Sequence, residues 1–189
     1  MAIPRQLPNA ITIARILCAP VFLWLLLADA GADGATRWVA AALFVVAIAT
    51  DGIDGHLARR NGLVSDLGKL LDPIADKALT GCAFVGLSIL GELPWWVTIV
   101  VLVREVGITV YRLIVVSDHV LAAAWMGKLK TVMQGVALSL ALAPLPSLVG
   151  QWVVWVDTAT MWLAVILTIA SGIDYVVGEV RGARRSARR

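Results

Sequence analysis

Charged residues are scarce in this chain. Lysine and arginine number 16, aspartate and glutamate 13, and together they make up 15% of the 189 residues, whereas 60% are hydrophobic and the mean hydropathy is +0.86. A soluble domain of this size needs a larger polar surface. The composition therefore excludes an ordinary soluble domain and predicts an integral membrane protein, with a length that allows one domain over residues 1–189.

Cysteine and histidine are also rare, with two of each. Cys18 and Cys82 both lie in apolar runs, which argues for small buried side chains and against a disulfide framework. His56 and His119 form no evident Ser–His or Cys–His pairing of the kind that nucleophilic catalysis uses, so we expect no covalent intermediate. The first apolar run lacks a small-residue cleavage site, and we interpret it as a retained helix.

Long apolar runs separated by turn-forming segments dominate the chain. A bilayer core requires about 20 apolar residues per helix. Six runs approach that length: 13–29, 37–60, 68–91, 94–116, 126–146 and 151–178. We therefore predict an all-α fold with six transmembrane helices.

Basic residues are distributed unevenly between the two sides of these helices. They concentrate at the N-terminal end, in the second and fourth loops and in the tail, whereas the third loop has Glu92 alone and the fifth has no charge. The positive-inside rule puts the basic side in the cytoplasm. This predicts a multi-pass protein of the cytoplasmic membrane with both termini in the cytoplasm.

The two ends of the chain each allow two interpretations. Residues 2–12 form a juxtamembrane segment that is consistent with a short interfacial helix and equally with a frayed terminus. The basic tail, residues 181–189, either anchors to anionic lipid headgroups or is disordered.

Four aspartates interrupt the apolar pattern on either side of the second loop. Asp51 and Asp54 are three residues apart, and Asp72 and Asp76 are four apart, so each pair lies on one helical face. The Asn-Gly turn at 61–62 predicts an antiparallel hairpin, in which Asp51 and Asp72 lie at equal depth, roughly 15 Å from its tip. The four carboxylates are therefore predicted to converge just inside the cytoplasmic leaflet.

Carboxylates this close together need a counter-charge. Clusters of oxygen ligands suit hard divalent cations such as Mg²⁺, which bridge carboxylates to substrate phosphates, and paired metals catalyse in-line attack at phosphorus. Salt bridges between the helices, or an ion-conducting or proton-relay site, are the alternatives. Gly55 and Gly68 indicate either close approach of a ligand or close packing of helices.

These residues belong to one longer pattern of fixed spacing. It runs Asp51-x2-Asp54-Gly55-x2-Ala58-Arg59-x8-Gly68-x3-Asp72-x3-Asp76. The pattern resembles the signature of the CDP-alcohol phosphotransferases, and the resemblance extends over the whole chain. It implies metal-dependent transfer of a phosphatidyl group from a CDP-linked lipid to an alcohol, with release of CMP.

The same resemblance implies a role for each position. Asp51, Asp54 and Asp72 would ligate two divalent cations, Mg²⁺ or Mn²⁺. Asp76 would touch the same metal site and act as the base toward the acceptor hydroxyl. The nucleotide site would be lined by Gly55, Ala58, Arg59 and Gly68.

A second polar set lies in the fourth and fifth runs. Arg104, Arg112, Lys128 and Lys130 supply several cations, which favours an anionic acceptor held through its phosphate. Snorkelling to lipid headgroups is the alternative for the two lysines. Pairing of Arg104 with Glu105 is disfavoured, because adjacent helical residues do not face each other.

Three further segments indicate which branch of this family the chain resembles. LPNAITIAR near the N-terminus, RE in the fourth run and GKLKT in the fifth resemble the branch of the family that uses glycerol 3-phosphate as acceptor. This implies CDP-diacylglycerol as donor and phosphatidylglycerophosphate as product, with Asn9, Thr12 and Arg15 near the donor headgroup. Phosphatidylglycerol or inositol phosphate as acceptor, hence a cardiolipin or phosphatidylinositol phosphate synthase, is the close alternative.

A small metal or proton transporter is the alternative of a different class. Its carboxylates would lie near the middle of the bilayer, often on Gly- or Pro-broken helices. Here the acids cluster near one face with the single Pro73 between them, so transport is disfavoured. The resemblance further implies a homodimer among membrane lipids with its active site facing the cytoplasm, and we expect no nucleic-acid partner.

Overall fold

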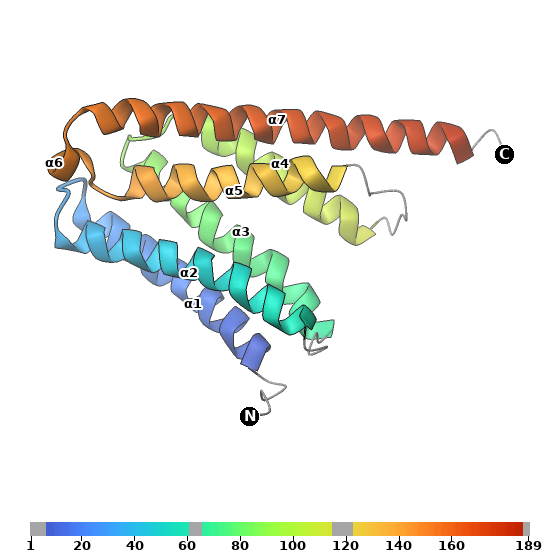
Figure 1. The fold of residues 1–189 in the computed structure, drawn as a ribbon, viewed down its shortest axis with the longest axis horizontal. Helices are drawn as coiled ribbons and strands as arrows, with labels where there is room; N and C mark the ends of the chain where they lie inside the picture. Colours follow the sequence, from blue (N-terminus) through green and yellow to red (C-terminus); the bar gives the residue numbers. More distant parts are fainter. Residues whose placement is uncertain (1–6, 61–65, 115–122, 187–189) are drawn as a thin grey trace. The chain divides into compact units, whose positions relative to one another are not determined.

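The computed structural model describes residues 7–60, 66–114 and 123–186, with side chains for 12–50, 74–111, 125–178 and Val180. Within these ranges the chain is helical throughout its regular structure and contains no strand (Figure 1). The helices are α1 (Leu7–Asp29), α2 (Ala35–Arg60), α3 (Asp66–Ile89), α4 (Trp95–Ile114), α5 (Ala123–Leu142), α6 (Pro146–Val149) and α7 (Trp152–Ser186). The predicted all-α class is confirmed.

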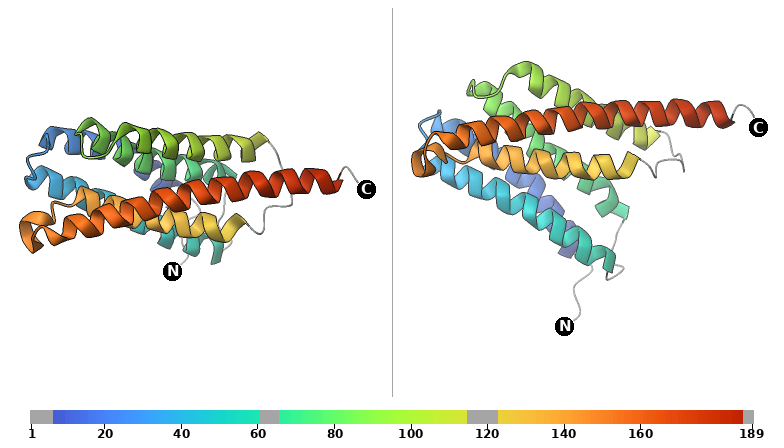
Figure 2. Two further views of the ribbon diagram at one scale, coloured as in Figure 1. Left: turned by 90° about the horizontal axis from the view of Figure 1, so that it is seen from above. Right: turned by 45° about the horizontal axis from the view of Figure 1, so that its top comes forward.

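Six of the seven described helices correspond to the predicted apolar runs, and α6 is a single turn in the predicted fifth loop. The structure describes part of each chain end. Residues 7–12 of the predicted juxtamembrane segment are continuous with α1, and residues 2–6 lie outside the described part of the structure. Pro8 is tolerated in the first turn of α1 because its missing N–H is not needed there. α7 continues to Ser186 without a proline, so residues 181–186 are helical (Figure 2).

Two of the described helices are long and apolar enough to cross a membrane by length and composition. They are Thr12–Asp29 in α1 and Trp152–Gly178 in α7, and the apolar part of α2, Ala35–Thr50, is shorter. These helices agree with the membrane character that the composition predicts. The other predicted spans do not meet the same criterion within the described residues.

The chain divides into two compact units. Unit 1 comprises Met1–Trp95 and Leu138–Leu145, and unit 2 comprises Trp96–Ala137 and Pro146–Arg189. Unit 1 therefore contains α1, α2, α3 and the last turn of α5. Unit 2 contains most of α4 and α5, together with α6 and α7.

The core of unit 1 is built around α1, which packs along both α2 and α3. Phe22 and Leu26 of α1 are fully buried, and the ring of Phe22 lies 5.4 Å from that of Phe44 on α2. On α3, Gly86 allows the close approach of α1, because a Cβ at this position would meet Leu26 Cδ2 at 2.6 Å. α1 thus connects the two helices that carry the aspartate motif.

Arg37, at the start of α2, stabilises the end of unit 1 that lies opposite the aspartate motif. Its guanidinium donates to both carboxylate oxygens of Glu92, beyond the end of α3, at 2.5 Å. It also donates to the main-chain oxygens of Ala141 and Leu142 at 3.0 and 3.1 Å. Asp29 caps α2, since its Oδ1 accepts a hydrogen bond from the backbone N–H of Arg37 at 3.2 Å.

Ring contacts in unit 2 tie α4 to α7 at two levels. The rings of Trp96 and Trp162 lie 5.8 Å apart, and those of Tyr111 and Tyr175 meet edge to face at 5.8 Å. Such pairs stabilise helix packing beyond the apolar area that they bury. Between these two levels, α4, α5 and α7 bring a set of polar side chains together.

Candidate functional site

The backbone places the aspartate motif on the two helix ends that the 61–65 connection joins. Asp51 and Asp54 lie in the last three turns of α2, and Asp72 and Asp76 lie in the first three turns of α3. Side chains from 51 to 73 lie outside the described part of the structure. The convergence of the four carboxylates, and the nucleotide-site roles of Gly55, Ala58, Arg59 and Gly68, therefore stay predictions.

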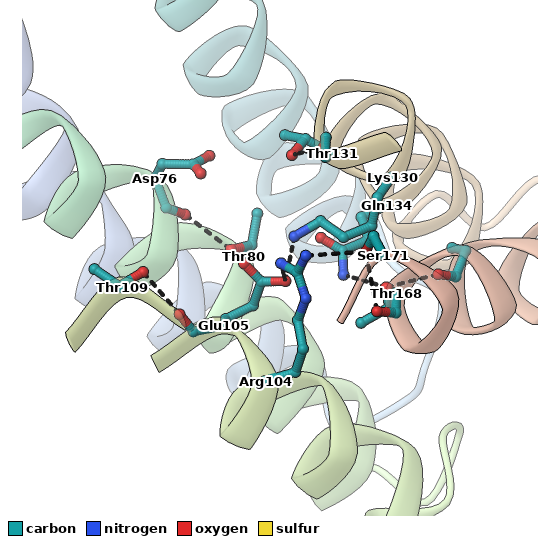
Figure 3. Close-up of polar contacts among 12 residues, drawn as sticks. Asp76, Thr80, Arg104, Glu105, Thr109, Lys130, Thr131, Gln134, Thr168 and Ser171 are labelled. Carbon is teal, nitrogen blue, oxygen red and sulfur yellow. Dashed lines mark hydrogen bonds and ion pairs between the residues drawn. The ribbon is translucent and has the colours of Figure 1, made fainter. Parts of the chain in front are cut away.

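Asp76 is the one motif aspartate whose side chain is described. It is half-buried, and its backbone carbonyl accepts a hydrogen bond from Thr80 Oγ1 at 2.8 Å (Figure 3). The neighbouring positions Ala75 and Leu79 are fully buried in the core of unit 1. Asp76 therefore lies next to the packed face of α3, on a helix whose orientation the core determines.

The predicted donor residues of α1 extend its buried stripe toward the motif. Thr12 and Arg15 are each 5% exposed and follow the same helical spacing as Ala19, Phe22 and Leu26. The N-terminal end of α1 lies toward the end of unit 1 where α2 ends and α3 begins (Figure 1). The buried stripe of α1 thus becomes polar toward the N-terminal end of the helix. The side chain of Asn9 lies outside the described residues.

In unit 2, one carboxylate holds two of the predicted acceptor-site cations. Arg104 Nη1 donates to Glu105 Oε1 at 3.0 Å, and Lys130 Nζ donates to the same oxygen (Figure 3). The expectation that Arg104 and Glu105 do not pair is therefore wrong. Their Cβ atoms point in different directions, but the arginine side chain is long enough to reach its neighbour's carboxylate.

Residues of α7 also contact the side chain of Arg104. Its Nη2 donates to Ser171 Oγ at 2.9 Å. Gly172 leaves the space for the side chain, since a Cβ there would meet Arg104 Cγ at 3.3 Å. Thr168 accepts a hydrogen bond from Gln134 of α5 at 2.9 Å, so that α4, α5 and α7 are joined through one polar network.

The network is buried and carries a net positive charge. Lys130 is 3% exposed and Glu105 8%, and the side chain of Arg104 is 16% exposed. Arg104 and Lys130 contribute two positive charges and Glu105 one negative charge, which leaves +1. A buried net positive charge is a feature that attracts an anion.

The other two predicted cations stand apart from these contacts. Lys128 is exposed on α5, because residues two apart on a helix do not share a face and Lys130 takes the buried one. Its exposure agrees with snorkelling to lipid headgroups. The side chain of Arg112, on α4, lies outside the described residues.

Sequence reasoning missed three members of the network, Ser171, Gln134 and Thr168, and considered Glu105 only as a disfavoured partner of Arg104. A helical-face argument would have found Gln134, which follows Lys130 by four residues in an otherwise apolar stretch. The contact of Arg104 with Ser171 joins residues 67 apart, and no local spacing indicates it.

Comparison with known proteins identifies the family. A family model described as CDP-alcohol phosphatidyltransferase matches residues 5–170. The chain is 45% identical over 185 residues to a probable phosphatidylglycerophosphate synthase of Mycobacterium tuberculosis, which covers 96% of this chain and 87% of the relative. It is 38% identical over 181 residues to the CDP-diacylglycerol–glycerol-3-phosphate 3-phosphatidyltransferase of Bacillus subtilis, covering 90% and 93%.

A shorter match is to a relative with a different name. The chain is 42% identical over 102 residues to a CMP-forming cardiolipin synthase of Streptomyces coelicolor, which covers 52% of this chain and 46% of the relative. The family model, in contrast, spans both compact units and the whole aspartate motif. The chain belongs to the CDP-alcohol phosphatidyltransferase family.

Proposed function

We propose that this protein transfers the phosphatidyl group of CDP-diacylglycerol to glycerol 3-phosphate, giving phosphatidylglycerophosphate and CMP. The observation that carries the proposal is the likeness, over nine tenths of the chain, to relatives named for this reaction. The buried cation network of unit 2 supports it, because a phosphate-bearing acceptor needs such partners.

The donor is held by the motif and by α1 in this proposal. Gly55, Ala58, Arg59 and Gly68 line the nucleotide site, and the donor headgroup is bound by Asn9, Thr12 and Arg15. The burial of Thr12 and Arg15 on the face of α1 that packs in unit 1 supports this assignment. An arginine in such a position binds phosphate through two parallel hydrogen bonds.

The four aspartates supply the ligands for divalent cations. Asp51, Asp54, Asp72 and Asp76 offer carboxylate oxygens only, and this donor set fits two Mg²⁺ or Mn²⁺ ions. Bound cations would neutralise the diphosphate of the donor and so lower the barrier to attack at phosphorus. Arg59 would add its positive charge to the same phosphates.

Asp76 acts as the base. The hydroxyl of glycerol 3-phosphate gives its proton to the Asp76 carboxylate, and the hydroxyl oxygen forms a bond to the phosphorus that carries diacylglycerol. The bond from this phosphorus to the CMP oxygen breaks, and CMP leaves. The half-buried position of Asp76 beside the core supports this role, since a base needs a defined orientation and access to substrate.

The acceptor phosphate is bound in unit 2. Arg104 and Lys130 form the buried part of this site, and Arg112 and Lys128 add positive charge on the same helices. Arginine provides a planar, two-pronged donor and lysine a point charge, so the pair suits the phosphate of a small acceptor.

We further propose that residues 1–189 form one membrane domain with six spans. The family model extends across both units, and the basic residues gather on one side of the predicted spans. This arrangement gives cytoplasmic termini in the cytoplasmic membrane and an active site that faces the cytoplasm, where glycerol 3-phosphate is dissolved. The protein is proposed to act as a homodimer.

Transfer to phosphatidylglycerol is the second candidate, favoured by the shorter match to a cardiolipin synthase. A panel of acceptors separates the two. The full chain is supplied with CDP-diacylglycerol and Mg²⁺ or Mn²⁺, and CMP release is measured with glycerol 3-phosphate, with phosphatidylglycerol and without acceptor. Release that depends on glycerol 3-phosphate supports the proposal. Release that depends on phosphatidylglycerol instead contradicts it.

A further inference from the structure

Glu105 occupies an unusual position between two cations. Arg104 Nη1, on its own helix, and Lys130 Nζ, from α5, both donate to the single oxygen Oε1. The carboxylate side chain is 10% exposed, and the lysine side chain 4%. Two positive groups therefore meet at one atom in a site that is nearly closed to water.

The carboxylate is what makes this arrangement of cations stable. Two like charges within a few ångströms of each other repel, and the repulsion grows where water is excluded. A shared negative oxygen replaces this repulsion by two attractions. It also leaves a net charge of +1 on the three groups, so that the site still attracts an anion.

The other terminal nitrogen of Arg104, Nη2, is held by α7. Nη2 donates to Ser171 of α7, whose hydroxyl donates in turn to the Thr168 carbonyl at 3.0 Å. The guanidinium plane is therefore determined by Glu105 at one edge and by α7 at the other. Its Nε is buried and, among the described residues, has no hydrogen-bond partner.

We propose that Glu105 is a positioning residue for the acceptor: its carboxylate draws Arg104 and Lys130 together and fixes the cation pair that receives the phosphate of glycerol 3-phosphate. Glu105 itself does not touch the reacting atoms. The inference rests on the proposed function and adds to it a residue that sets the affinity for the acceptor and leaves the donor site unaffected.

A purely structural salt bridge between α4 and α5 would behave differently. Loss of such a bridge lowers the stability of the fold and affects both substrates alike. Loss of a positioning residue raises the KM for one substrate, because the binding groups are present but no longer oriented. The two substrates of this reaction therefore provide an internal control.

The experiment compares steady-state kinetics of the full chain with those of four variants, Glu105→Gln, Glu105→Asp, Lys130→Met and the double variant Glu105→Gln/Lys130→Met. Asp174→Asn is the matched control, since Asp174 is an exposed acid on α7. For Glu105→Gln we expect a rise in the KM for glycerol 3-phosphate of roughly tenfold or more. The KM for CDP-diacylglycerol and kcat at saturating acceptor should stay within about twofold.

Two further comparisons make the test specific. Glu105→Asp keeps the charge and should show a smaller rise in the KM for glycerol 3-phosphate than Glu105→Gln. In the Lys130→Met background, Glu105→Gln should raise the KM for glycerol 3-phosphate by less than it does in the unmodified chain. Both substitutions break the contact between Glu105 and Lys130, and only the contact of Glu105 with Arg104 is left to lose. Should Glu105→Gln fail to fold by thermal unfolding, the KM of Glu105→Asp decides in its place.

Three results would overturn the inference: a folded Glu105 variant with an unchanged KM for glycerol 3-phosphate, an equal rise for both substrates, or effects of Glu105→Gln and Lys130→Met that simply add. Asp174→Asn with the same rise as Glu105→Gln would also overturn it. Turnover of the unmodified chain with glycerol 3-phosphate tests the proposed function itself. The ratio of KM values between each variant and the unmodified chain tests the role of Glu105. Failure of the proposed function and failure of the Glu105 proposal are therefore distinguishable.

Discussion

Arg37 and Glu92 form a two-pronged ion pair across unit 1, with Nη1–Oε1 and Nη2–Oε2 distances of 2.5 Å. The arginine side chain is 4% exposed and the glutamate side chain 34%. The pair joins the start of α2 to the segment that follows α3. It therefore holds, at their far ends, the two helices that present the aspartate motif.

Replacing Arg37 by Met should destabilise the fold more than replacing Glu92 by Gln. The first change removes the bonds to Glu92 and to the Ala141 and Leu142 carbonyls, whereas the second leaves the carbonyl bonds in place. We expect the free energy of unfolding to fall by about 2–4 kcal/mol for Arg37→Met and by about 1–3 kcal/mol for Glu92→Gln. Thermal unfolding in detergent measures both. Equal melting temperatures for all three proteins would contradict the structural role of the pair.

Arg15 should determine the affinity for the donor. Because its side chain is buried on the face of α1 that leads to the motif, Arg15→Met should raise the KM for CDP-diacylglycerol by roughly tenfold or more. Arg15→Lys keeps the charge but loses the two-pronged geometry, so it should recover only part of the affinity. The KM for glycerol 3-phosphate is the internal control. A selective change in that constant would contradict the assignment.

Substitution of Gly172 should lower the affinity for the acceptor, because it changes the position of Arg104. In Gly172→Ala the new Cβ lies 3.3 Å from Arg104 Cγ, so the arginine must move by a few tenths of an ångström, which disturbs its hydrogen bond to Ser171. We expect the KM for glycerol 3-phosphate to rise by about three- to tenfold, which corresponds to a weakened hydrogen bond. Gly178→Ala, on the same helix with open space around its Cβ position, is the matched control and should behave as the unmodified chain. Equal kinetics of the two variants would argue against this role of Gly172.

Asp76→Asn should abolish turnover and leave donor binding largely intact. The amide is nearly the same size as the carboxylate but cannot accept the hydroxyl proton, so the loss of kcat should be at least about a hundredfold. Thr80 should still donate to the backbone carbonyl of residue 76, which keeps the local helix unchanged. Single-turnover CMP release and binding of CDP-diacylglycerol separate the two effects. Near-normal turnover would show that another group is the base.

The helices of this chain were predictable because each apolar run has the length and the flanking turns of a helix. The observed α2 and α3 begin within two residues of the predicted runs, which start at 37 and 68. Apolar length says less about helix ends. α1 starts at Leu7, before the apolar run, because a proline in the first turn is compatible with a helix.

The polar contacts were harder to predict, since they depend on which helices become neighbours. Arg37 and Glu92 are 55 residues apart, and their charges entered the sequence reasoning only as a count for each loop. Arg104 and Glu105 are adjacent, and side chains of adjacent helical residues leave the helix in different directions. The arginine side chain is nevertheless long enough to reach the carboxylate, which the sequence reasoning did not take into account. The sequence therefore indicated a group of cations on these helices, whereas the carboxylate that joins Arg104 and Lys130 was wrongly set aside as a partner.

The most direct test of the proposed reaction is the transfer of labelled glycerol 3-phosphate into lipid. The full chain is incubated in vesicles with CDP-diacylglycerol, Mg²⁺ or Mn²⁺ and radiolabelled glycerol 3-phosphate. We expect label to enter the organic phase as phosphatidylglycerophosphate, with one CMP released for each labelled lipid and with neither product formed by Asp76→Asn. CMP released without labelled lipid, or no label in the organic phase at all, would contradict the account.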